Sequence, residues 1–348
     1  MRCTGATNHR VDRTHCTKKY NPPAGHVAEN RSNRTCNVFE ETIINTLKKK
    51  LAIALFMFVL LDARAELVAS DAKYAENTIQ TSNQRLFLSS DGGFYELTRD
   101  SAGWHKNMLP AIFRDGVARP CYYLGIAETA GTVYTVCTEN FSNPFAKKYL
   151  MGLNIYQPAP QLIEAGQLTG MSSINGLDAD GSGNLYAADP GLPLLSGKII
   201  KITMAGSHTI ATQNVFHRFI ASKPNGIRYA GGKMYISTNP TTYIGTSELM
   251  RYDLGANGLY NARTIFKSLW FLDDFMLVQG GAVVTEFLGG RLTHINESGS
   301  VLHRASFSQP TSITLLSAST YGSGSVLVTR RDAGEVHRLA SNWGLLKR

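Results

Sequence analysis

Four residues with oxygen-bearing side chains recur at matching places in segments of similar sequence. Each lies ten or eleven residues before the central aromatic or apolar residue of an expected strand, and the four are Glu76, Asn175, Asn225 and Asp274. Two carboxylates and two amides form a set of hard oxygen donors, which suits Ca²⁺ better than Mg²⁺ or Mn²⁺. The set contains no His or Cys, which argues against a dedicated zinc site.

The segments that carry these residues are repeats of one pattern. The pattern is clearest in residues 173–189, 223–238 and 272–287, where a polar pair precedes a short apolar strand, a glycine-containing turn and a second apolar strand. The three segments are about fifty residues apart, and repeats of about 40–50 residues built from strands and turns are typical of β-propeller blades.

Six such units can be followed along the chain, and helical periodicity is weak throughout. The units begin at or near Ala75, Cys121, Ser172, Lys223, Leu272 and Gln309. We therefore expect an all-β protein with a six-bladed β-propeller fold. Because the innermost strands of the blades converge on a central channel, the four polar residues are expected at one end of it. Leu124 and Thr311 are expected at the matching positions of the second and sixth blades.

Each polar residue alone also has an ordinary structural explanation. Asn-Gly and Asp-Gly pairs form turns, and an Asn before a strand often satisfies local backbone groups. Four such residues in register are harder to explain by turn formation. Four further acids are interpreted as turn or strand-edge residues: Asp91, Asp178, Asp180 and Asp189.

The charge of the 348-residue chain is distributed unevenly. Residues 1–65 contain 11 Lys and Arg against 5 Asp and Glu, whereas the remainder contains 24 against 21. The net charge of +9 therefore comes mainly from the N-terminal segment, and no basic patch with interleaved aromatic residues stands out elsewhere. This distribution argues against a nucleic-acid partner.

The N-terminal segment has the features of a secretory signal. Lys48–Lys50 precede eleven apolar residues, 51–61, and the A-x-A sequence Ala63–Arg64–Ala65 follows. We expect a signal peptide over 47–65 with cleavage after Ala65, and a secreted or periplasmic protein without stable membrane insertion after cleavage. An uncleaved anchor is the competing interpretation, although the apolar run is shorter than the ~20 residues that span a bilayer. Residues 1–46 are interpreted as a disordered leader or a mis-assigned start, and the propeller is expected over 66–348.

Cys121 and Cys137 flank a segment that is expected to form two strands joined by a turn near Thr129–Ala130. Such a hairpin places the two cysteines opposite each other, where cross-strand Cβ atoms lie about 4.5–5.5 Å apart. This distance is close to what a disulfide requires, and exported proteins meet oxidising conditions. A disulfide is therefore expected, and two buried free thiols are the alternative.

Three segments resemble the calcium-dependent six-bladed propellers of the SMP-30/gluconolactonase family, also called regucalcin-like lactonases. They are PNGIRYAGGKMYIST, LDDFMLVQGGAVVTEFLGGRLTHINESGSVL and QPTSITLL, and the resemblance extends over about Ala75 to Leu339. It implies a divalent metal bound by Glu76, Asn225 and Asp274, with Asn175 at the metal or at the substrate. The family's PDG sequence is LDD here, so Asp273 competes with Asp274 for the ligand role, and its PTN is PTS. These departures indicate a divergent branch rather than a true gluconolactonase.

The resemblance implies a metal-dependent hydrolase that acts on a lactone or related ester. Ca²⁺ is the expected cation, with Mn²⁺, Mg²⁺ or Zn²⁺ as alternatives, and it would activate both the carbonyl group and water. Asp274 would act as ligand and general base, with Asp273 as the alternative base. Asn175 and Arg228 are expected to bind a small-molecule substrate. The sequence contains no G-x-S-x-G motif, so serine-esterase chemistry is not supported.

The competing function is a non-catalytic secreted propeller that binds a protein or glycan and uses its cation for structure. An exposed aromatic patch would favour it. The strongest candidates for such a patch are Tyr260, Phe266, Trp270 and Phe271, for which packing between blades is the simpler interpretation. A strictosidine-synthase-like propeller, which shares the Asn-Gly signature, is a third alternative. In each case we expect a monomer.

Overall fold

The computed structural model describes residues 65–192, 194–242, 245–321 and 324–340. The expected leader and signal peptide lie outside these residues, except for Ala65, which begins the first strand. Almost all of the regular structure described is β-strand, and the helix α2 (Ala318–Tyr321) is a single turn. Within the described part of the chain, no helix is long and apolar enough to cross a membrane.

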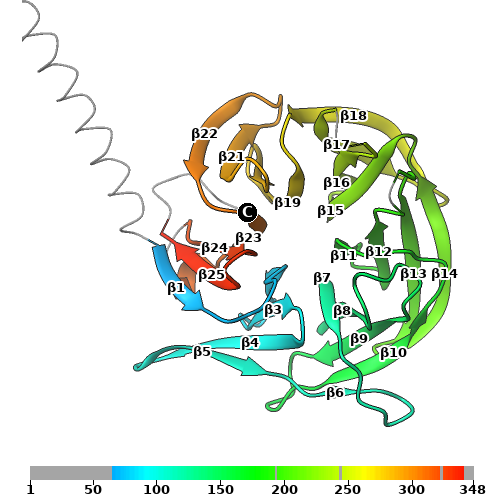
Figure 1. Ribbon diagram of the computed structural model, residues 1–348, viewed down its shortest axis with the longest axis vertical. Coiled ribbons are helices and arrows are strands. Elements are labelled where there is room, and N and C mark those ends of the chain that lie inside the picture. Colours follow the sequence, from blue (N-terminus) through cyan, green and yellow to red (C-terminus); the bar gives the residue numbers. More distant parts are fainter. Residues whose placement is uncertain (1–64, 193, 243–244, 322–323, 341–348) are drawn as a thin grey trace, which may run out of the picture. The chain divides into compact units, whose positions relative to one another are not determined.

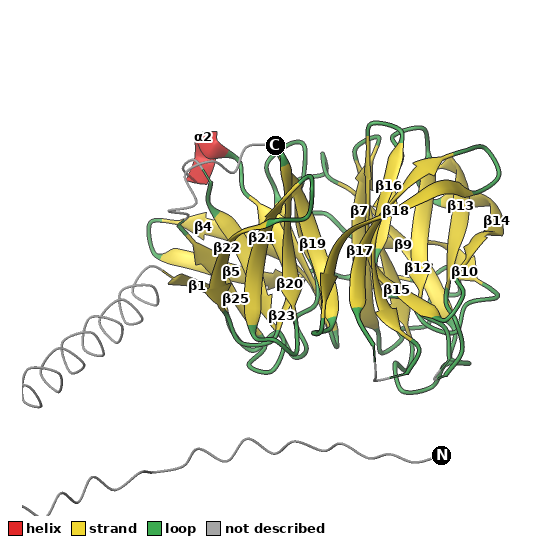
Figure 2. Ribbon diagram, turned by 90° about the horizontal axis from the view of Figure 1, so that it is seen from above, coloured by secondary structure: helices red, strands yellow, loops and turns green. Residues whose placement is uncertain are grey.

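Six sheets surround a common axis and form a six-bladed β-propeller, which confirms the predicted fold class (Figure 1). In the described residues, five sheets have four strands and one has five. From the side, the strands run between two faces at which the connecting loops gather (Figure 2). The innermost strand of each blade lies next to the axis, so residues near the starts of these strands meet around it (Figure 1).

The first three blades follow one another along the chain. The first contains β2 (Thr78–Gln80), β3 (Leu86–Ser90), β4 (Gly93–Asp100) and β5 (Gly103–Met108). The second contains β7 (Tyr122–Thr129), β8 (Thr132–Thr138), β9 (Lys148–Asn154), β10 (Leu162–Leu168) and the short edge strand β6 (Ala111–Ile112). The third contains β11 (Leu177–Ala179), β12 (Asn184–Asp189), β13 (Lys198–Gly206) and β14 (Thr209–Arg218).

The remaining blades complete the ring. The fourth contains β15 (Ser222–Ala230), β16 (Lys233–Pro240), β17 (Ser247–Leu254) and β18 (Leu259–Ser268). The fifth contains β19 (Leu272–Val278), β20 (Gly281–Glu286), β21 (Arg291–Asn296) and β22 (Val301–Ser306). The sixth contains β23 (Pro310–Leu315), β24 (Val326–Arg330), β25 (Glu335–Leu339) and, from the start of the described chain, β1 (Ala65–Ala69).

The ring is closed by β1, which pairs antiparallel with β25. Glu66 fixes this strand, since its carboxylate accepts hydrogen bonds from Arg338, Arg99 and Trp104. The six sequence units contained no sign of this contribution, because β1 lies ahead of the first repeat.

The core lies between neighbouring blades rather than within one of them. In the described chain, six clusters of buried apolar side chains can be distinguished, and each combines residues of two adjacent blades. Every residue of β3 and β8 is buried, whereas β22 is almost entirely exposed. A strand that is covered on both faces needs a continuous run of apolar or small residues, which explains sequences such as TVYTVCT.

The glycine of the Asn-Gly pairs is required by close packing of the innermost strands. A Cβ atom on Gly226 would lie 2.7 Å from Asp274 Oδ1, and one on Gly176 would lie 2.4 Å from the carbonyl oxygen of Asn225. Neither glycine has a positive φ angle. The sequence interpretation of these pairs as turn residues is therefore incomplete, because the missing side chain is what lets adjacent blades approach each other.

Cys121 and Cys137 form a disulfide, with their Cα atoms 5.0 Å apart. The register of β7 and β8 pairs Cys137 with Tyr123, so the two cysteines are diagonal neighbours rather than directly opposite. The turn between these strands lies at Ala130–Gly131, and both residues have positive φ angles. The disulfide links the residue just before β7 to the buried strand β8.

Replacing both cysteines, Cys121→Ser with Cys137→Ser, is expected to lower the free energy of unfolding by about 3 kcal/mol, because the bond closes a short loop in the unfolded chain. Urea denaturation of both proteins measures the difference. Reductant is expected to destabilise the wild type and to leave the double variant unchanged. Equal stabilities would show that the bond does not constrain the unfolded chain.

Candidate functional site

The starts of the innermost strands share one backbone arrangement. In four blades the second residue of a polar pair donates its N–H to a hydroxyl on the next strand: Asn77 to Ser89, Gly226 to Ser237, Asp274 to Thr285, and Ser312 to Thr329. The residue before each of these is therefore structurally equivalent from blade to blade. These equivalent residues are Glu76, Asn225, Asp273 and Thr311.

Asn175 belongs to the same set, on backbone evidence. Its N–H bonds to Ala188 O, and Ala188 N–H bonds to Gly176 O. The same two bonds join Glu76 to Ser89 and Ser89 to Asn77. Glu76 and the asparagines of the third and fourth blades thus occupy matching positions, as the sequence alignment expected.

The fifth blade departs from that alignment by one residue. The register shifts between Leu272 and Phe275, so two residues of β19, Asp273 and Asp274, face one residue of β20. The equivalent position is that of Asp273, and Asp274 matches Gly226. The fourth blade has the same bulge, in which Asn225 and Gly226 face Ser237. The counterpart of Tyr235 in the fifth blade is therefore Val283 rather than Val284, and the count from Val284 was one residue out.

The second and sixth blades place no free side-chain oxygen at this position. Leu124 holds the matching position of the second blade, as expected, because a Cβ atom on the following Gly125 would lie 2.9 Å from the carbonyl oxygen of Asn175, as one on Gly176 would lie 2.4 Å from that of Asn225. Its side chain is apolar and is buried in the core between the second and third blades. Thr311 directs its hydroxyl to Ala75 O and to the Thr329 hydroxyl.

Three carboxyl groups are buried together at the axis. Glu76 is 2% exposed, Asp273 6% and Asp274 3%. Burial, opposed by Arg331 and assisted by Asp274, raises the pKa of Glu76 to about 7. Burial and the charge of Glu76 raise the pKa of Asp273 well above its usual value. The pKa of Asp274 is raised by burial, although Arg228 opposes this. Ionising all three carboxyl groups in this buried space therefore costs free energy that the two arginines do not fully offset.

Several polar atoms of this cluster lack partners. Within the described residues, Glu76 Oε2, Asn225 Oδ1 and Asp274 Oδ1 are buried without a hydrogen bond. A buried oxygen without a partner costs about 1–3 kcal/mol. All three atoms belong to residues that the sequence predicted as metal ligands.

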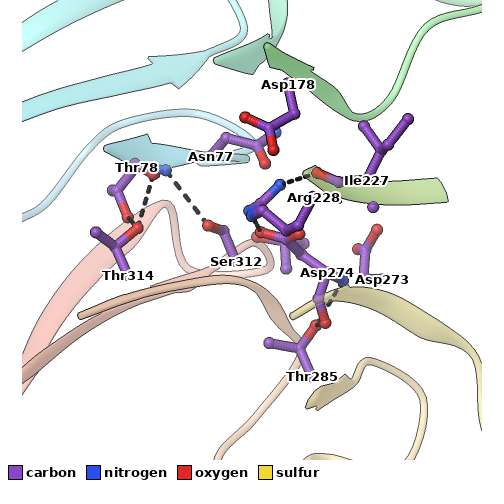
Figure 3. Close-up of polar contacts among 12 residues, drawn as sticks. Asn77, Thr78, Asp178, Ile227, Arg228, Asp273, Asp274, Thr285, Ser312 and Thr314 are labelled. Atoms are coloured by element: carbon purple, nitrogen blue, oxygen red, sulfur yellow. Dashed lines mark hydrogen bonds and ion pairs between the residues drawn. The ribbon is translucent and has the colours of Figure 1, made fainter. Parts of the chain in front are cut away.

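Arg228 forms the main ion pair of the site. Its Nη2 donates to Asp274 Oδ2 at 2.6 Å, and its Nη1 donates to Ile227 O at 2.7 Å. Figure 3 shows Asp178 directed towards the same guanidinium from the neighbouring blade. Burial raises the pKa of Asp178 to about 6, while Arg228 opposes this shift. Arg228 is thus engaged within the site by Asp274 rather than projecting from it.

Asp178 is a site residue that the sequence analysis missed. It was interpreted as a turn or strand-edge residue without a role in the site; it lies in the short strand β11 and accepts the N–H of Tyr229 from the next blade. The signal that could have found it is spacing, since Asp178 follows Asn175 by three residues as Arg228 follows Asn225. Asp180 and Asp189 do accept local backbone N–H groups, which confirms their interpretation as structural residues.

Arg331 and Tyr122 are two further residues that the sequence did not indicate. Arg331 follows β24, and its Nε lies 3.9 Å from Glu76 Oε2. Its Nη2 donates to the Tyr122 hydroxyl at 3.4 Å. The charge of Arg331 also acts on Asp273. These contacts join residues about 200 or more positions apart in the sequence, which no local motif reveals.

The donor chemistry fits a hard cation if amide oxygens take part. Across the described residues, no group of three or more His, Cys, Asp or Glu side chains is arranged to hold a metal ion. The acids alone therefore do not form a site. Glu76, Asn225 and Asp273 at equivalent positions would add an amide to two carboxylates, and the unpartnered oxygens of Glu76 and Asn225 suit Ca²⁺.

Other surface features are separate from this cluster. A hollow of about 450 Å³ is lined by Arg99, Asp100, Ser101, Ala102, Gly103, Thr320 and Tyr321, none of which belongs to the site. In the aromatic group considered as a patch, Phe266 is buried, whereas Tyr260 and Trp270 are exposed. Packing between blades therefore explains Phe266 but not the other two.

No protein-family model matches the sequence, and no curated protein matches it. Similar solved structures do exist. A luciferin-regenerating enzyme is 16% identical, with 82% of this chain and 97% of that chain covered and a TM-score of 0.58. A gluconolactonase from Xanthomonas campestris is 15% identical, with 79% and 88% covered and a TM-score of 0.57. The PQQ-bound aldose sugar dehydrogenase of Streptomyces coelicolor is 13% identical, with 79% and 97% covered and a TM-score of 0.53. These similarities establish the fold that the chain shares with them.

The buried acids make stability dependent on pH. The pKa of Glu76 rises from 4.5 to about 7 and that of Asp178 from 3.8 to about 6, so the folded protein holds protons that the unfolded chain releases. The free energy of unfolding of the metal-free protein is therefore expected to fall as the pH rises from about 4 to about 7.

Glu76→Gln removes the carboxyl group of Glu76 and with it one of the two pKa shifts. The pH-dependent decrease in the free energy of unfolding is therefore expected to be smaller by an amount of order 2 kcal/mol. Urea unfolding in the presence of a chelator, at a series of pH values, measures both profiles. A stability that increases across this window in the wild type would contradict the assignment.

Proposed function

We propose that this protein is a divalent-cation-dependent hydrolase of lactones or related esters. The observation that carries the proposal is the set of buried oxygen donors at equivalent positions of three blades, in which Glu76 Oε2 and Asn225 Oδ1 lack a hydrogen-bond partner. Buried polar atoms are almost always satisfied in proteins, so such atoms suggest a ligand. The shared fold with a gluconolactonase supports the same reaction class.

In this proposal Glu76, Asn225 and Asp273 hold the cation, and Asn175 completes the set or contacts the substrate. The register supports Asp273 as the donor of the fifth blade. Asp274, the donor expected from the sequence, has its Oδ2 engaged by Arg228 and keeps only Oδ1 available. Ca²⁺ is the cation that such a set prefers, and Mn²⁺, Mg²⁺ and Zn²⁺ remain to be compared.

The bound cation would polarise the substrate carbonyl and stabilise the oxyanion. The remaining steps belong to residues of this chain. Asp273, buried beside Glu76, would accept a proton from water through the carboxylate oxygen that the cation leaves free. Arg228 keeps Asp274 in place through their ion pair, so this pair fixes the backbone of the bulge that presents Asp273.

Hydrolysis of a lactone panel by residues 66–348 is expected to stop when chelator removes the cation and to return when Ca²⁺, Mn²⁺, Mg²⁺ or Zn²⁺ is added. Glu76→Gln is expected to lower the rate by about 100-fold, because it removes a charged donor. Rates that are unchanged in chelator would contradict the proposal. Stabilisation by the cation without any turnover would instead support a binding propeller with a structural cation.

The two fifth-blade acids can be separated by comparing Asp273→Asn with Asp274→Asn. Asp273→Asn is expected to abolish the increase in melting temperature that the cation produces, because a donor is lost. Asp274→Asn is expected to retain most of this increase and to lose stability in the absence of cation, because Arg228 loses its charged partner. Thermal unfolding with and without cation measures both effects. The reverse result would make Asp274 the ligand.

A further inference from the structure

Arg331 is a partly buried guanidinium with few hydrogen-bond partners. Its side chain is 26% exposed, and in the described residues its polar contacts are the 3.4 Å hydrogen bond to the Tyr122 hydroxyl and the 3.9 Å ion pair with Glu76. Arg85, which is similarly buried, makes four hydrogen bonds of 2.6–2.8 Å to Glu96, Ile155 and Gln157. A guanidinium has five N–H donors, so Arg331 retains the capacity to bind a further acceptor.

Cation binding at the site would change one of the two polar contacts of Arg331, the ion pair with Glu76. If Glu76 binds a cation, as the proposed function requires, its negative charge is offset by that cation. Arg331 then keeps a positive charge for which the contacts above supply no other carboxylate. An anionic group of the substrate would satisfy this charge and the remaining donors together.

Aromatic rings surround this guanidinium. Its Cζ lies 5.5 Å from the ring centroid of Tyr74 and 6.0 Å from that of Phe287. Tyr122 packs against Tyr74, with centroids 6.3 Å apart, and stacks on Phe141 at 4.6 Å. Tyr74 and Phe141 are 45% and 44% exposed. Arg331 is therefore bordered by partly exposed aromatic surface that can cover an apolar ligand.

We propose that Arg331 binds a carboxylate of the substrate. The substrates are then lactones or esters of organic acids that carry a free carboxylate besides the bond to be cleaved, with an apolar or aromatic body resting on Tyr74 and Phe141. A planar carboxylate matches the guanidinium geometry and carries a single negative charge. This inference rests on the proposed function for the reaction, but not for the binding of the carboxylate itself.

The test is a binding measurement with two probes that cannot be hydrolysed, 3-phenylpropanoate and its neutral analogue 3-phenylpropanamide. Calorimetric titration of the Ca²⁺-loaded wild type is expected to show about 10-fold or more preference for the carboxylate, because a charged hydrogen-bonded pair forms. Arg331→Gln is expected to remove this preference and to leave the weak affinity for the amide unchanged.

Arg330→Gln is the matched control, because the neighbouring Arg330 bonds to Asp332 and Glu335 instead of the site residues. It is expected to bind both probes as the wild type does. Arg331→Lys keeps the charge without the planar donor pair, so an intermediate preference is expected, and it serves if Arg331→Gln does not fold. Equal binding of the two probes by the wild type, or an unchanged preference in folded Arg331→Gln or Arg331→Lys, would overturn the inference.

The outcome can be separated from that of the proposed function. The proposed function fails if chelator leaves lactone hydrolysis unaffected. The inference about Arg331 fails only on the carboxylate preference, which is measured without turnover. A preference for the carboxylate that weakens in chelator would further support it, because Glu76 without its cation competes for Arg331.

Discussion

The placement of like charges in a buried space is the constraint on which this site depends. Glu76, Asp273 and Asp274 lie at the axis with raised pKa values, and Asp178 lies close by. Arg228 and Arg331 offset only part of this charge. Such a cluster is costly for a fold that does not use it, since each acid could be replaced by a neutral residue. The cation of the proposed function would offset this cost.

The propeller supplies the precision that this arrangement needs. Each donor is held by a bulged start of an innermost strand, and the bulge is fixed by a serine or threonine hydroxyl on the next strand. Gly176 and Gly226 allow neighbouring blades to approach closely enough for residues of different blades to interact. The site is therefore carried by the central sheets, while the loops at its mouth remain free to vary.

The sequence predicted the features that recur from blade to blade and missed those that are specific to one blade or depend on closure of the ring. The alternation of strands and turns was enough for the six blades, and Glu76, Asn175 and Asn225 could be aligned because the spacing in their blades differs by only one residue. In the fifth blade the count started from Val284, whose counterpart in the fourth blade is Ile236 rather than Tyr235, so Asp274 was chosen in place of Asp273. Leu124 was also placed in register, but its apolar side chain packs in the core between the second and third blades and provides no oxygen donor. Arg331 was missed because its contacts depend on the closure of the ring rather than on neighbouring sequence.

The pairing of β1 with β25 also constrains how the molecule can be assembled. These strands lie about 270 residues apart, so the sixth blade cannot be completed until nearly the whole described chain has been synthesised. Until then an unfinished sheet and the unpaired β1 strand are exposed, which favours association with other chains. Substitutions near either end of the described chain would disturb the same sheet. Replacing Glu66 and replacing Arg338 should therefore weaken the closure of the ring in similar ways.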